Sequence, residues 1–561
     1  MTRAKRRGVS ALTALAAAVL TGCTLTSLQE RKMESAVLWP VDPLVKVFQD
    51  ATPPEQPPAI AEVVAARNEF ESLQFVLRAT APLTGIRARV AGLRGATANF
   101  VGFVPLRANT RRTPDTEVVR KAPGRFPDPL LPPSLERLEA ETSLPVWVTV
   151  RVPKGKRPGT YGGRLVVEAD QGRLEQPFAL RVTRATLPDA RTLWVTNWFS
   201  ALGPRFKSFH GVDDWSEAHW KVLEHYAQAM AAYRQNVVLT PIYSLIDFTA
   251  GQDGKLAFGF ERFDRWVRLF QDAGAIGLIE GGHLGGRDGG WTAQHFNINI
   301  RAVRDGKVAG EHGHPDDPKV EAFLAQFLPA LERHLAERGW LDTYLQHLCD
   351  EPIKENAESY RTLAALVRKH APRIRRIDAN HYAELVGSID VWVPQLNYYD
   401  QSYPFYCERQ KAGEQVWTYT CLAPTDTYPN RLIDYSLLKV RLLHWVNFAF
   451  GATGYLHWGW NQWSVKDPFA DVEPPHGPGV FLPPGDAWIV YPSKEGVLSS
   501  IRFEAMRDGI EDYELLALLA RKAPAKAKAL AERMVPKIAA PEKDIAKFRQ
   551  ARLELLDALS E

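Results

Sequence analysis

Short apolar segments alternate with longer amphipathic segments from about residue 189 onward, and this rhythm most constrains the fold. Segments of this length and spacing predict strands alternating with helices, which form parallel βαβ units. The predicted strands lie within residues 193–199, 236–242, 276–283, 343–352, 375–380, 389–397, 415–422 and 454–461. The predicted helices lie near residues 215–234, 261–273, 318–338, 355–370, 431–449 and 502–521. Eight strands with helices between them predict an α/β fold, a (β/α)8 TIM-like barrel over residues 189–522; a doubly wound open sheet is the alternative.

Residues 61–188 follow a pattern typical of an all-β domain. Segments such as 71-ESLQFVLRA-79 and 144-LPVWVTVRVP-153 alternate apolar and polar residues, and turns rich in Pro and Gly separate them. This pattern predicts an N-terminal β-sandwich, with no catalytic constellation of its own. Residues 523–561 are rich in Ala, Lys and Glu and predict a C-terminal helical tail.

The first residues have the pattern of an export signal. Four of residues 3–7 are basic, the apolar segment ALTALAAAVL follows, and 20-LTGC-23 resembles a bacterial lipobox. We therefore predict a lipoprotein signal peptide at 1–22, lipidation of Cys23 and a Pro-rich tether over 23–60. An ordinary signal peptide with a chance cysteine is the alternative. Thr24 after the cysteine, in place of an acidic residue, favours sorting to the outer membrane, so we expect a lipid-anchored protein of the cell envelope.

Charge and cysteine content narrow the classes of function. The net charge of +4 is spread along the chain and gives no basis for nucleic-acid binding. Cys349, Cys407 and Cys421 have irregular spacing and form no disulfide framework, although one pair could still form. The sequence contains no HExxH motif, no P-loop and no dinucleotide fingerprint, and we expect neither a metal nor a cofactor.

Polar and aromatic residues gather where the predicted strands end. In a (β/α)8 barrel the chemistry lies at the carboxyl ends of the strands. Aromatic rings can stack on the apolar face of a sugar, and amide and carboxylate groups can bind its hydroxyls, so this set predicts a carbohydrate site. Packing in the core is the competing interpretation for each Trp. The candidate substrate-binding residues are His283, His347, Asn397, Tyr398, Trp417, Tyr419, Trp458 and Trp460.

Two adjacent acids, Asp350 and Glu351, end one of the predicted strands. They could cap the helix that follows Pro352, because acids stabilise a helix N-terminus. They could instead be catalytic, because a neighbouring carboxylate raises the pKa of a general acid. Ordinary glycosidases place two carboxyl groups on opposite sides of the scissile bond, whereas a sequential pair suits substrate-assisted hydrolysis. In that mechanism the 2-acetamido oxygen of the substrate attacks the anomeric carbon.

Several segments resemble glycoside hydrolase family 123. These are 277-GLIEGGHLGG-286, 344-YLQHLCDEP-352, 454-GYLHWGWNQW-463 and 503-FEAMRDGIEDYELL-516, with 66-ARNEFESLQFVLRA-79 and 145-PVWVTVRVPKGKRPGTYGG-163 resembling the preceding sandwich. The resemblance covers residues 60–520. It implies a retaining, metal-independent β-N-acetylgalactosaminidase, in which Asp350 orients the acetamido group and Glu351 acts as general acid and base.

Two other functions stay open at this stage. The protein could be a surface lipoprotein that binds glycans without cleaving them, or a glycosidase of the same fold with another sugar specificity. The intact Asp350–Glu351 pair favours an enzyme. The choice between N-acetylgalactosamine and N-acetylglucosamine depends on the orientation of one hydroxyl group.

Overall fold

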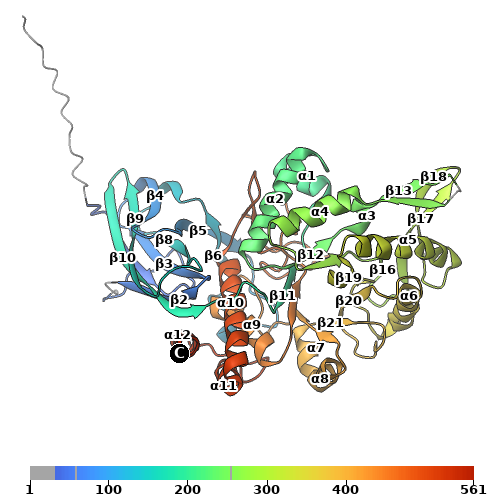
Figure 1. Ribbon diagram of the computed structural model, residues 1–561. Helices are drawn as coiled ribbons and strands as arrows, with labels where there is room; N and C mark the ends of the chain where they lie inside the picture. Colours follow the sequence, from blue (N-terminus) through green and yellow to red (C-terminus); the bar gives the residue numbers. More distant parts are fainter. Residues whose placement is uncertain (1–31, 57–59, 253–254) are drawn as a thin grey trace, which may run out of the picture.

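The computed structural model describes residues 32–56, 60–252 and 255–561 (Figure 1). The predicted signal peptide and Cys23 lie outside these residues. A β-sandwich domain packs beside a larger domain of parallel strands and helices. Within the described ranges, no helix combines the length and apolar character needed to cross a membrane.

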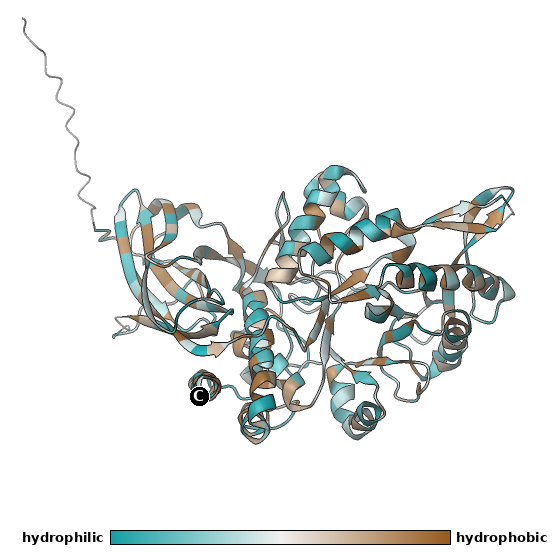
Figure 2. Ribbon diagram, viewed as in Figure 1, coloured by the Kyte–Doolittle hydropathy of each residue, from teal (hydrophilic) through white to brown (hydrophobic). Residues whose placement is uncertain are grey.

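The N-terminal domain consists of two five-stranded sheets. One has the order β1 (Ala36–Val41), β3 (Phe70–Ala79), β8 (Ser143–Arg151), β5 (Ala96–Leu106) and β6 (Gly124–Leu131). The other has the order β2 (Ala61–Arg67), β10 (Gly172–Thr186), β9 (Gly159–Ala169), β4 (Leu83–Ala91) and β7 (Ser134–Leu138). Alternate side chains, such as Phe75, Val146 and Val167, form a buried core, and Figure 2 shows the corresponding alternation of hydropathy along the strands.

The predicted tether at 23–60 is wrong for residues 36–41, which form strand β1 of the sandwich. This strand pairs antiparallel with β3, and Trp39 is buried against Val47 and Val76. The high proline content of the segment obscured this strand in the sequence. Pro40 is compatible with β1 because β1 lies at the edge of its sheet, where a missing N–H group breaks no ladder.

Each of the eight predicted strand segments of the larger domain contains a parallel strand, but the strands fall into two sheets. The six-stranded sheet has the order β12 (Val237–Thr240), β15 (Leu278–Gly281), β19 (Tyr344–His347), β20 (Arg375–Asn380), β21 (Val391–Pro394) and β22 (Gln415–Val416). The three-stranded sheet has the order β11 (Trp194–Asn197), β24 (Gly454–His457) and β23 (Thr418–Tyr419). The fold is therefore mixed α/β, and the sheet pairing does not by itself establish a closed barrel.

One apolar cluster joins the two parallel sheets. It includes Leu345 and Ile377 from the six-stranded sheet and Leu456 from the three-stranded sheet, with Trp194 packed against it. The strands are short and buried, as expected for parallel strands whose outer face is covered by helices. This arrangement directs the loops after the strands to one side of the sheets.

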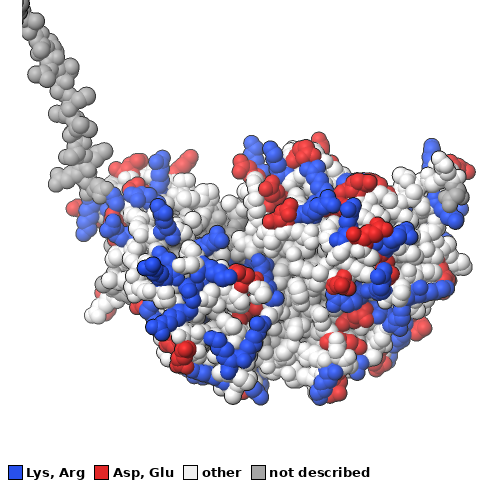
Figure 3. All heavy atoms as spheres, in the orientation of Figure 1, with Lys and Arg blue, Asp and Glu red and all other residues white. Residues whose placement is uncertain are grey.

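Helices connect most of the parallel strands. They are α1 (Gly203–His210), α2 (Glu217–Ala232), α3 (Ile242–Leu245), α4 (Glu261–Asp272), α5 (Pro318–Glu337), α6 (Ala357–His370), α7 (Leu396–Gln401), α8 (Tyr403–Lys411), α9 (Leu437–Ala449) and α10 (Ile501–Lys522). The insertions are β13 (Asp247–Ala250) with β14 (Leu256–Gly259), β16 (Gly285–Arg287) with β17 (Phe296–Arg304) and β18 (Lys307–Gly313), and β25 (Tyr491–Pro492) with β26 (Val497–Leu498). Basic and acidic side chains are interspersed over the right half of Figure 3, as is usual for the solvent-facing sides of helices.

The two domains meet at a buried network of charged residues around α10, which lies between them (Figure 1). Arg441 bonds Glu71 of β3 and Asp512 of α10. The predicted tail forms α11 (Pro524–Met534) and α12 (Ile545–Ser560), and α12 packs against β10 and β2. Arg552 of α12 joins the same network through Glu69 and Glu71. The tail thus contributes to the contact between the domains.

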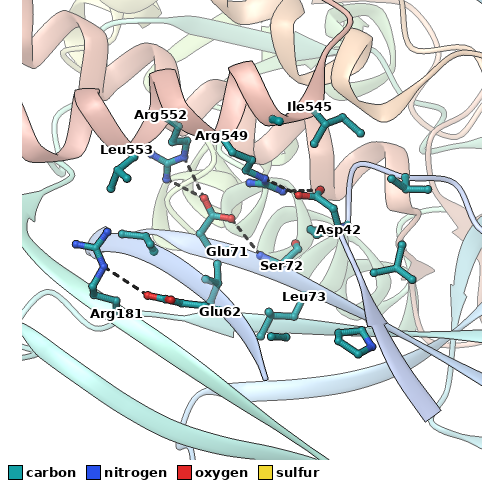
Figure 4. Close-up of a pocket in the computed structure, with 18 of the residues that line it drawn as sticks. Asp42, Glu62, Glu71, Ser72, Leu73, Arg181, Ile545, Arg549, Arg552 and Leu553 are labelled. Atoms are coloured by element: carbon teal, nitrogen blue, oxygen red, sulfur yellow. Dashed lines mark hydrogen bonds and ion pairs between the residues drawn. The ribbon is translucent and has the colours of Figure 1, made fainter. Parts of the chain in front are cut away.

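A cavity of about 810 Å³ lies between α12 and the sandwich (Figure 4). Its charged side chains are paired with one another: Arg549 with Asp42, and Arg552 with Glu71. None of the predicted site residues lines this cavity. It is therefore not the candidate active site.

Candidate active site

Asp350 and Glu351 lie in the loop at the carboxyl end of β19, and their backbone is held on two sides. The Glu351 N–H donates to the Ala379 carbonyl of β20 at 3.0 Å. Arg287, at the end of β16, donates to the carbonyl oxygens of both Asp350 and Glu351. Glu351 has a φ of 50°, in the left-handed region, which costs a non-glycine residue about 1–3 kcal/mol. These contacts hold the acid in a backbone conformation that is unfavourable by itself.

The Glu351 carboxylate is surrounded by groups that favour its charged form. The Tyr419 hydroxyl donates to Oε1, and Nε2 of His381 lies 3.4 Å from the same oxygen. Burial raises the pKa of Glu351, but hydrogen bonds from His381 and Tyr419 and the charge of Arg287 outweigh burial and lower it. Glu351 is therefore the more acidic member of the pair.

The surroundings of the Asp350 carboxyl group favour its protonated form. Burial and the negative charges of Glu351 and Asp378 raise the pKa of Asp350 to about 7. Because 46% of the Asp350 side chain is exposed, water screens part of the burial effect, and the two neighbouring carboxylates are the firmer cause. Because the pKa of Asp350 is raised and that of Glu351 is lowered, Asp350 is the member of the pair that holds a proton more readily.

A charged network lies buried beneath the pair. The His347 ring, at the end of β19, bonds Glu280 through Nε2 at 2.7 Å and Asp378 through Nδ1 at 2.8 Å. Burial alone would lower the pKa of His347, but the two carboxylates raise it to about 10. Tyr360 also donates to Asp378, at 2.5 Å. The network is rigid because each of its central groups has at least two partners.

His283, just after β15, lies between this network and Asp350. Its Nε2 is 3.9 Å from Asp350 Oδ1 and 3.7 Å from Asp378 Oδ1, and it has no hydrogen-bond partner among the described residues. Burial and the charge of His347 lower the pKa of His283 well below its ordinary value. A neutral imidazole beside Asp350 can exchange a hydrogen bond with a substrate hydroxyl or amide.

Three donor groups here are close enough to suggest a metal site. Donor atoms of His283, His347 and Asp378 lie within 4.8 Å of one another. Both nitrogens of His347 already bond carboxylates, and the ring is protonated at neutral pH. A metal would have to displace a proton and break one of these bonds, so the donor set fits an ion pair better than a metal.

Comparison with known proteins identifies the family. The profile described as the catalytic domain of glycoside hydrolase 123 matches residues 204–519, more than half of the chain. The chain belongs to glycoside hydrolase family 123. This confirms the resemblance seen in the sequence and makes the protein a glycoside hydrolase.

Of the solved structures compared, a family 123 enzyme supports the fold. A family 123 glycoside hydrolase from Clostridium perfringens, studied for glycolipid glycan hydrolysis, has a TM-score of 0.72 at 16% identity, covering 94% of this chain and 97% of its own. A GH10 xylanase with a bacterial Ig-like domain from termite gut matches 67% of this chain and 91% of its own at 11% identity, with a TM-score of 0.31. A Parabacteroides merdae β-glucuronidase matches 70% and 45% at 9% identity, with a TM-score of 0.25. Among curated proteins no significant match was found.

Five of the predicted substrate-binding residues of this family 123 protein lie at or directly after the carboxyl ends of strands, and four of them lie beside the pair or near it. Besides His283 and Tyr419, Asn397 and Tyr398 lie at the start of α7, directly after β21. The Tyr398 ring is 4.6 Å from the His381 ring, and Asn397 Oδ1 is buried without a partner in the described part of the chain. Trp458 is half-buried after β24, and its indole N–H donates to Asp486 at 3.2 Å.

Three predicted substrate-binding residues are corrected by their burial. His347 is fully buried with both ring nitrogens engaged, so it supports the site from beneath. Trp417 is fully buried in the cluster between the sheets, close to Gly454. Trp460 is fully buried against Tyr226. Trp460 lies beyond the end of β24, whereas His347 ends β19 and Trp417 lies between β22 and β23. The burial of all three depends on contacts that are distant in sequence, which the local pattern does not show.

Arg287, Trp291 and Asp378 were missed by the sequence analysis. Asp378 had a visible signal, because it is an acid within the predicted strand 375–380, where a buried charge needs a partner. Arg287 and Trp291 belong to the insertion that begins with β16, which has no periodic signal of its own. Only the folded insertion brings them to Asp350 and Glu351.

Proposed function

We propose that this family 123 hydrolase removes terminal β-linked N-acetylhexosamine, preferentially N-acetylgalactosamine, with retention of configuration through an oxazolinium intermediate. The observation that carries the proposal is the unequal environment of two adjacent carboxyl groups. Glu351 is surrounded by hydrogen-bond donors, whereas Asp350 faces Asp378 and His283. Neighbours on one loop can act on the same side of the anomeric carbon, which is what substrate assistance requires.

The reaction then has two steps. In the first, the acetamido oxygen forms a bond to the anomeric carbon as the glycosidic bond breaks, and Glu351 gives its proton to the leaving oxygen. Asp350 accepts a hydrogen bond from the acetamido N–H and stabilises the positive charge on the ring. In the second, Glu351 takes a proton from water, whose oxygen attacks the anomeric carbon and reopens the ring. Two inversions give net retention.

In the free protein the raised pKa of Asp350 and the lowered pKa of Glu351 favour protonation of Asp350, whereas this reaction needs the proton on Glu351. An acetamido N–H that donates to Asp350 favours its ionised form, because hydrogen bonding to a charged group lowers that group's pKa. Substrate binding thus moves the proton toward Glu351.

The two parallel sheets together are proposed to form the (β/α)8 barrel. The sheets approach each other at two places. Only Trp417 separates β22 from β23 along the chain. On the other side, the N–H of Asn236, just before β12, donates to the Val195 carbonyl of β11 at 3.2 Å. The shared apolar cluster lies inside this ring of strands. The domain limits that follow are a sandwich that begins at β1 and a catalytic domain over residues 189–522.

A lipid at Cys23 is proposed to anchor the enzyme in the cell envelope, with a surface glycan or glycolipid as substrate. The basic, apolar and LTGC segments support the anchor. The solved relative from Clostridium perfringens, described for glycolipid glycan hydrolysis, supports this substrate class. Expression of wild type and Cys23→Ala with a radiolabelled fatty acid tests the anchor. Label in the wild type alone is expected, and equal labelling of both contradicts it.

Hydrolysis of four aryl β-glycosides tests the reaction: those of N-acetylgalactosamine, N-acetylglucosamine, galactose and glucose. We expect turnover of the two N-acetylated glycosides, with the N-acetylgalactosaminide preferred. We also expect inhibition by a thiazoline mimic of the cyclised intermediate. NMR of the first product should show the β-anomer. Equal turnover of galactoside and N-acetylgalactosaminide would remove the acetamido group from the mechanism. Binding of sugars without turnover would make the protein a glycan-binding module.

A further inference from the structure

Trp291 is a large aromatic residue with 47% of its surface exposed, although it lies close to the catalytic pair. It belongs to the hairpin loop between β16 and β17. The loop is closed at its base by the Asp288 N–H on the His295 carbonyl at 3.0 Å, and Asn356 donates to the Ala293 carbonyl at 3.2 Å. An exposed indole on an anchored loop is a preformed apolar surface.

Arg287 fixes this indole relative to the two acids. The guanidinium carbon lies 4.0 Å from the Trp291 ring centroid, and Nε donates to the Trp291 carbonyl at 3.0 Å. The two terminal nitrogens of the same guanidinium bond the carbonyls of Asp350 and Glu351. One rigid, planar group therefore connects the indole with the backbone of both catalytic residues.

Trp291 also contacts His381, which lies beside Glu351, the proposed general acid. Its ring lies 5.4 Å from the His381 ring, and His381 Nε2 lies 3.4 Å from Glu351 Oε1. The indole is thus on the Glu351 side of the pair, whereas His283 and Asp378 lie on the Asp350 side. In the proposed reaction Glu351 faces the glycosidic oxygen, so the leaving group extends toward the indole.

We propose that Trp291 binds the leaving group of the substrate by stacking on its first sugar ring. This inference rests on the proposed function and adds a residue that determines specificity for the aglycone. A pyranose presents an apolar face of C–H groups, which an exposed indole covers well. A methyl or other small aglycone is too short to use this surface.

The test compares Trp291→Ala, Trp291→Phe and wild type on three probes: a disaccharide with N-acetylgalactosamine β-linked to galactose, the methyl β-N-acetylgalactosaminide, and the thiazoline. For Trp291→Ala we expect kcat/KM on the disaccharide to fall about tenfold, the size of one aromatic stacking contact. The methyl glycoside and the thiazoline lack a second sugar ring. The kcat/KM for the methyl glycoside and the inhibition constant of the thiazoline should therefore change less than about twofold. Trp291→Phe should keep most of the disaccharide activity.

Phe481→Ala is the matched control. Phe481 is also an exposed aromatic stacked on an arginine, 4.6 Å from the Arg107 guanidinium, outside the predicted site. It should leave all three values unchanged. An unchanged disaccharide value for Trp291→Ala, or an equal loss on all three probes, overturns the aglycone surface and leaves the proposed function standing. A wild type that cleaves neither glycoside overturns the proposed function and this inference with it.

Discussion

The imidazole of His347 donates its Nδ1 hydrogen to Oδ1 of Asp378 at 2.8 Å, in a position closed to solvent. The second nitrogen donates to Glu280 at 2.7 Å. Asp378 in turn contributes to the raised pKa of Asp350. The histidine thus stabilises two buried acids and, through Asp378, affects the electrostatics of Asp350 and Glu351.

Replacement of His347 by Ala should lower the free energy of unfolding by about 3–5 kcal/mol, because it leaves two buried carboxylates without their cation. Urea denaturation followed by tryptophan fluorescence measures this change. His370→Ala is a suitable control, since His370 is only partly buried and bonds the half-exposed Glu321. A loss no larger than that of His370→Ala would show that the network is not structural.

The same network predicts a pH dependence of stability. The folded pKa of His347, about 10, lies above the ordinary value of 6.5 that applies to the unfolded chain. Its contribution is therefore fully present below pH 6.5 and is lost as pH rises toward 10. The unfolding free energy of the wild type should decline across this window more steeply than that of His347→Ala. Parallel declines would argue against a charged His347.

Activity should depend on pH through the catalytic pair. The raised pKa of Asp350, about 7, means that the shared proton is lost above neutral pH, and kcat/KM should fall there. On the acidic side, kcat/KM should fall as Glu351, whose pKa is lowered, becomes protonated in the doubly protonated pair. A pH profile of kcat/KM on an aryl N-acetylgalactosaminide measures both limits. A flat profile through pH 7 would contradict the shared proton.

Tyr419→Phe tests separately the fall of kcat/KM at low pH, called the acidic limit below. The Tyr419 hydroxyl stabilises the ionised Glu351, so its removal raises the pKa of Glu351 and moves the acidic limit to higher pH. The limit above neutral pH should move less, because Tyr419 does not bond Asp350. Tyr398→Phe is the control, since the Tyr398 ring packs on His381 but, among the residues that the structure describes, its hydroxyl does not bond Glu351. A shift of the acidic limit to lower pH would overturn this assignment.

The sequence predicted what depends on local pattern. Each parallel strand follows from an apolar segment, and Asp350 with Glu351 is visible as an acidic pair at the end of one of them. Burial beyond the strand ends depends on contacts that are distant in sequence, and for this reason Trp417 and Trp460 were assigned to the site although they pack in the core. Arg287 and Trp291 were missed because their role arises only when an insertion folds back on the pair.

The roles of the two acids predict different leaving-group dependence. Glu351→Gln should lower kcat/KM by about 10²–10⁴-fold on glycosides with poor leaving groups and much less on activated aryl glycosides, which need little protonation. Asp350→Asn should impair both substrate types, because the acetamido group loses its ionised partner in each. The comparison uses a nitrophenyl glycoside beside a methyl glycoside. Equal, mild losses from the two substitutions would contradict the assigned roles.

Trp458 at the rim and Trp417 in the core test whether a tryptophan binds sugar or only packs. Trp458 is half-buried and its indole N–H is held by Asp486, which is fully buried. Trp417 is fully buried between the sheets. Trp458→Ala should raise KM for an N-acetylgalactosaminide with a small loss of stability, whereas Trp417→Ala should lower the free energy of unfolding by about 3–5 kcal/mol. Paired kinetics and urea denaturation measure both. If Trp458→Ala changes stability as much as Trp417→Ala and leaves KM unaltered, Trp458 belongs to the core and does not bind the sugar.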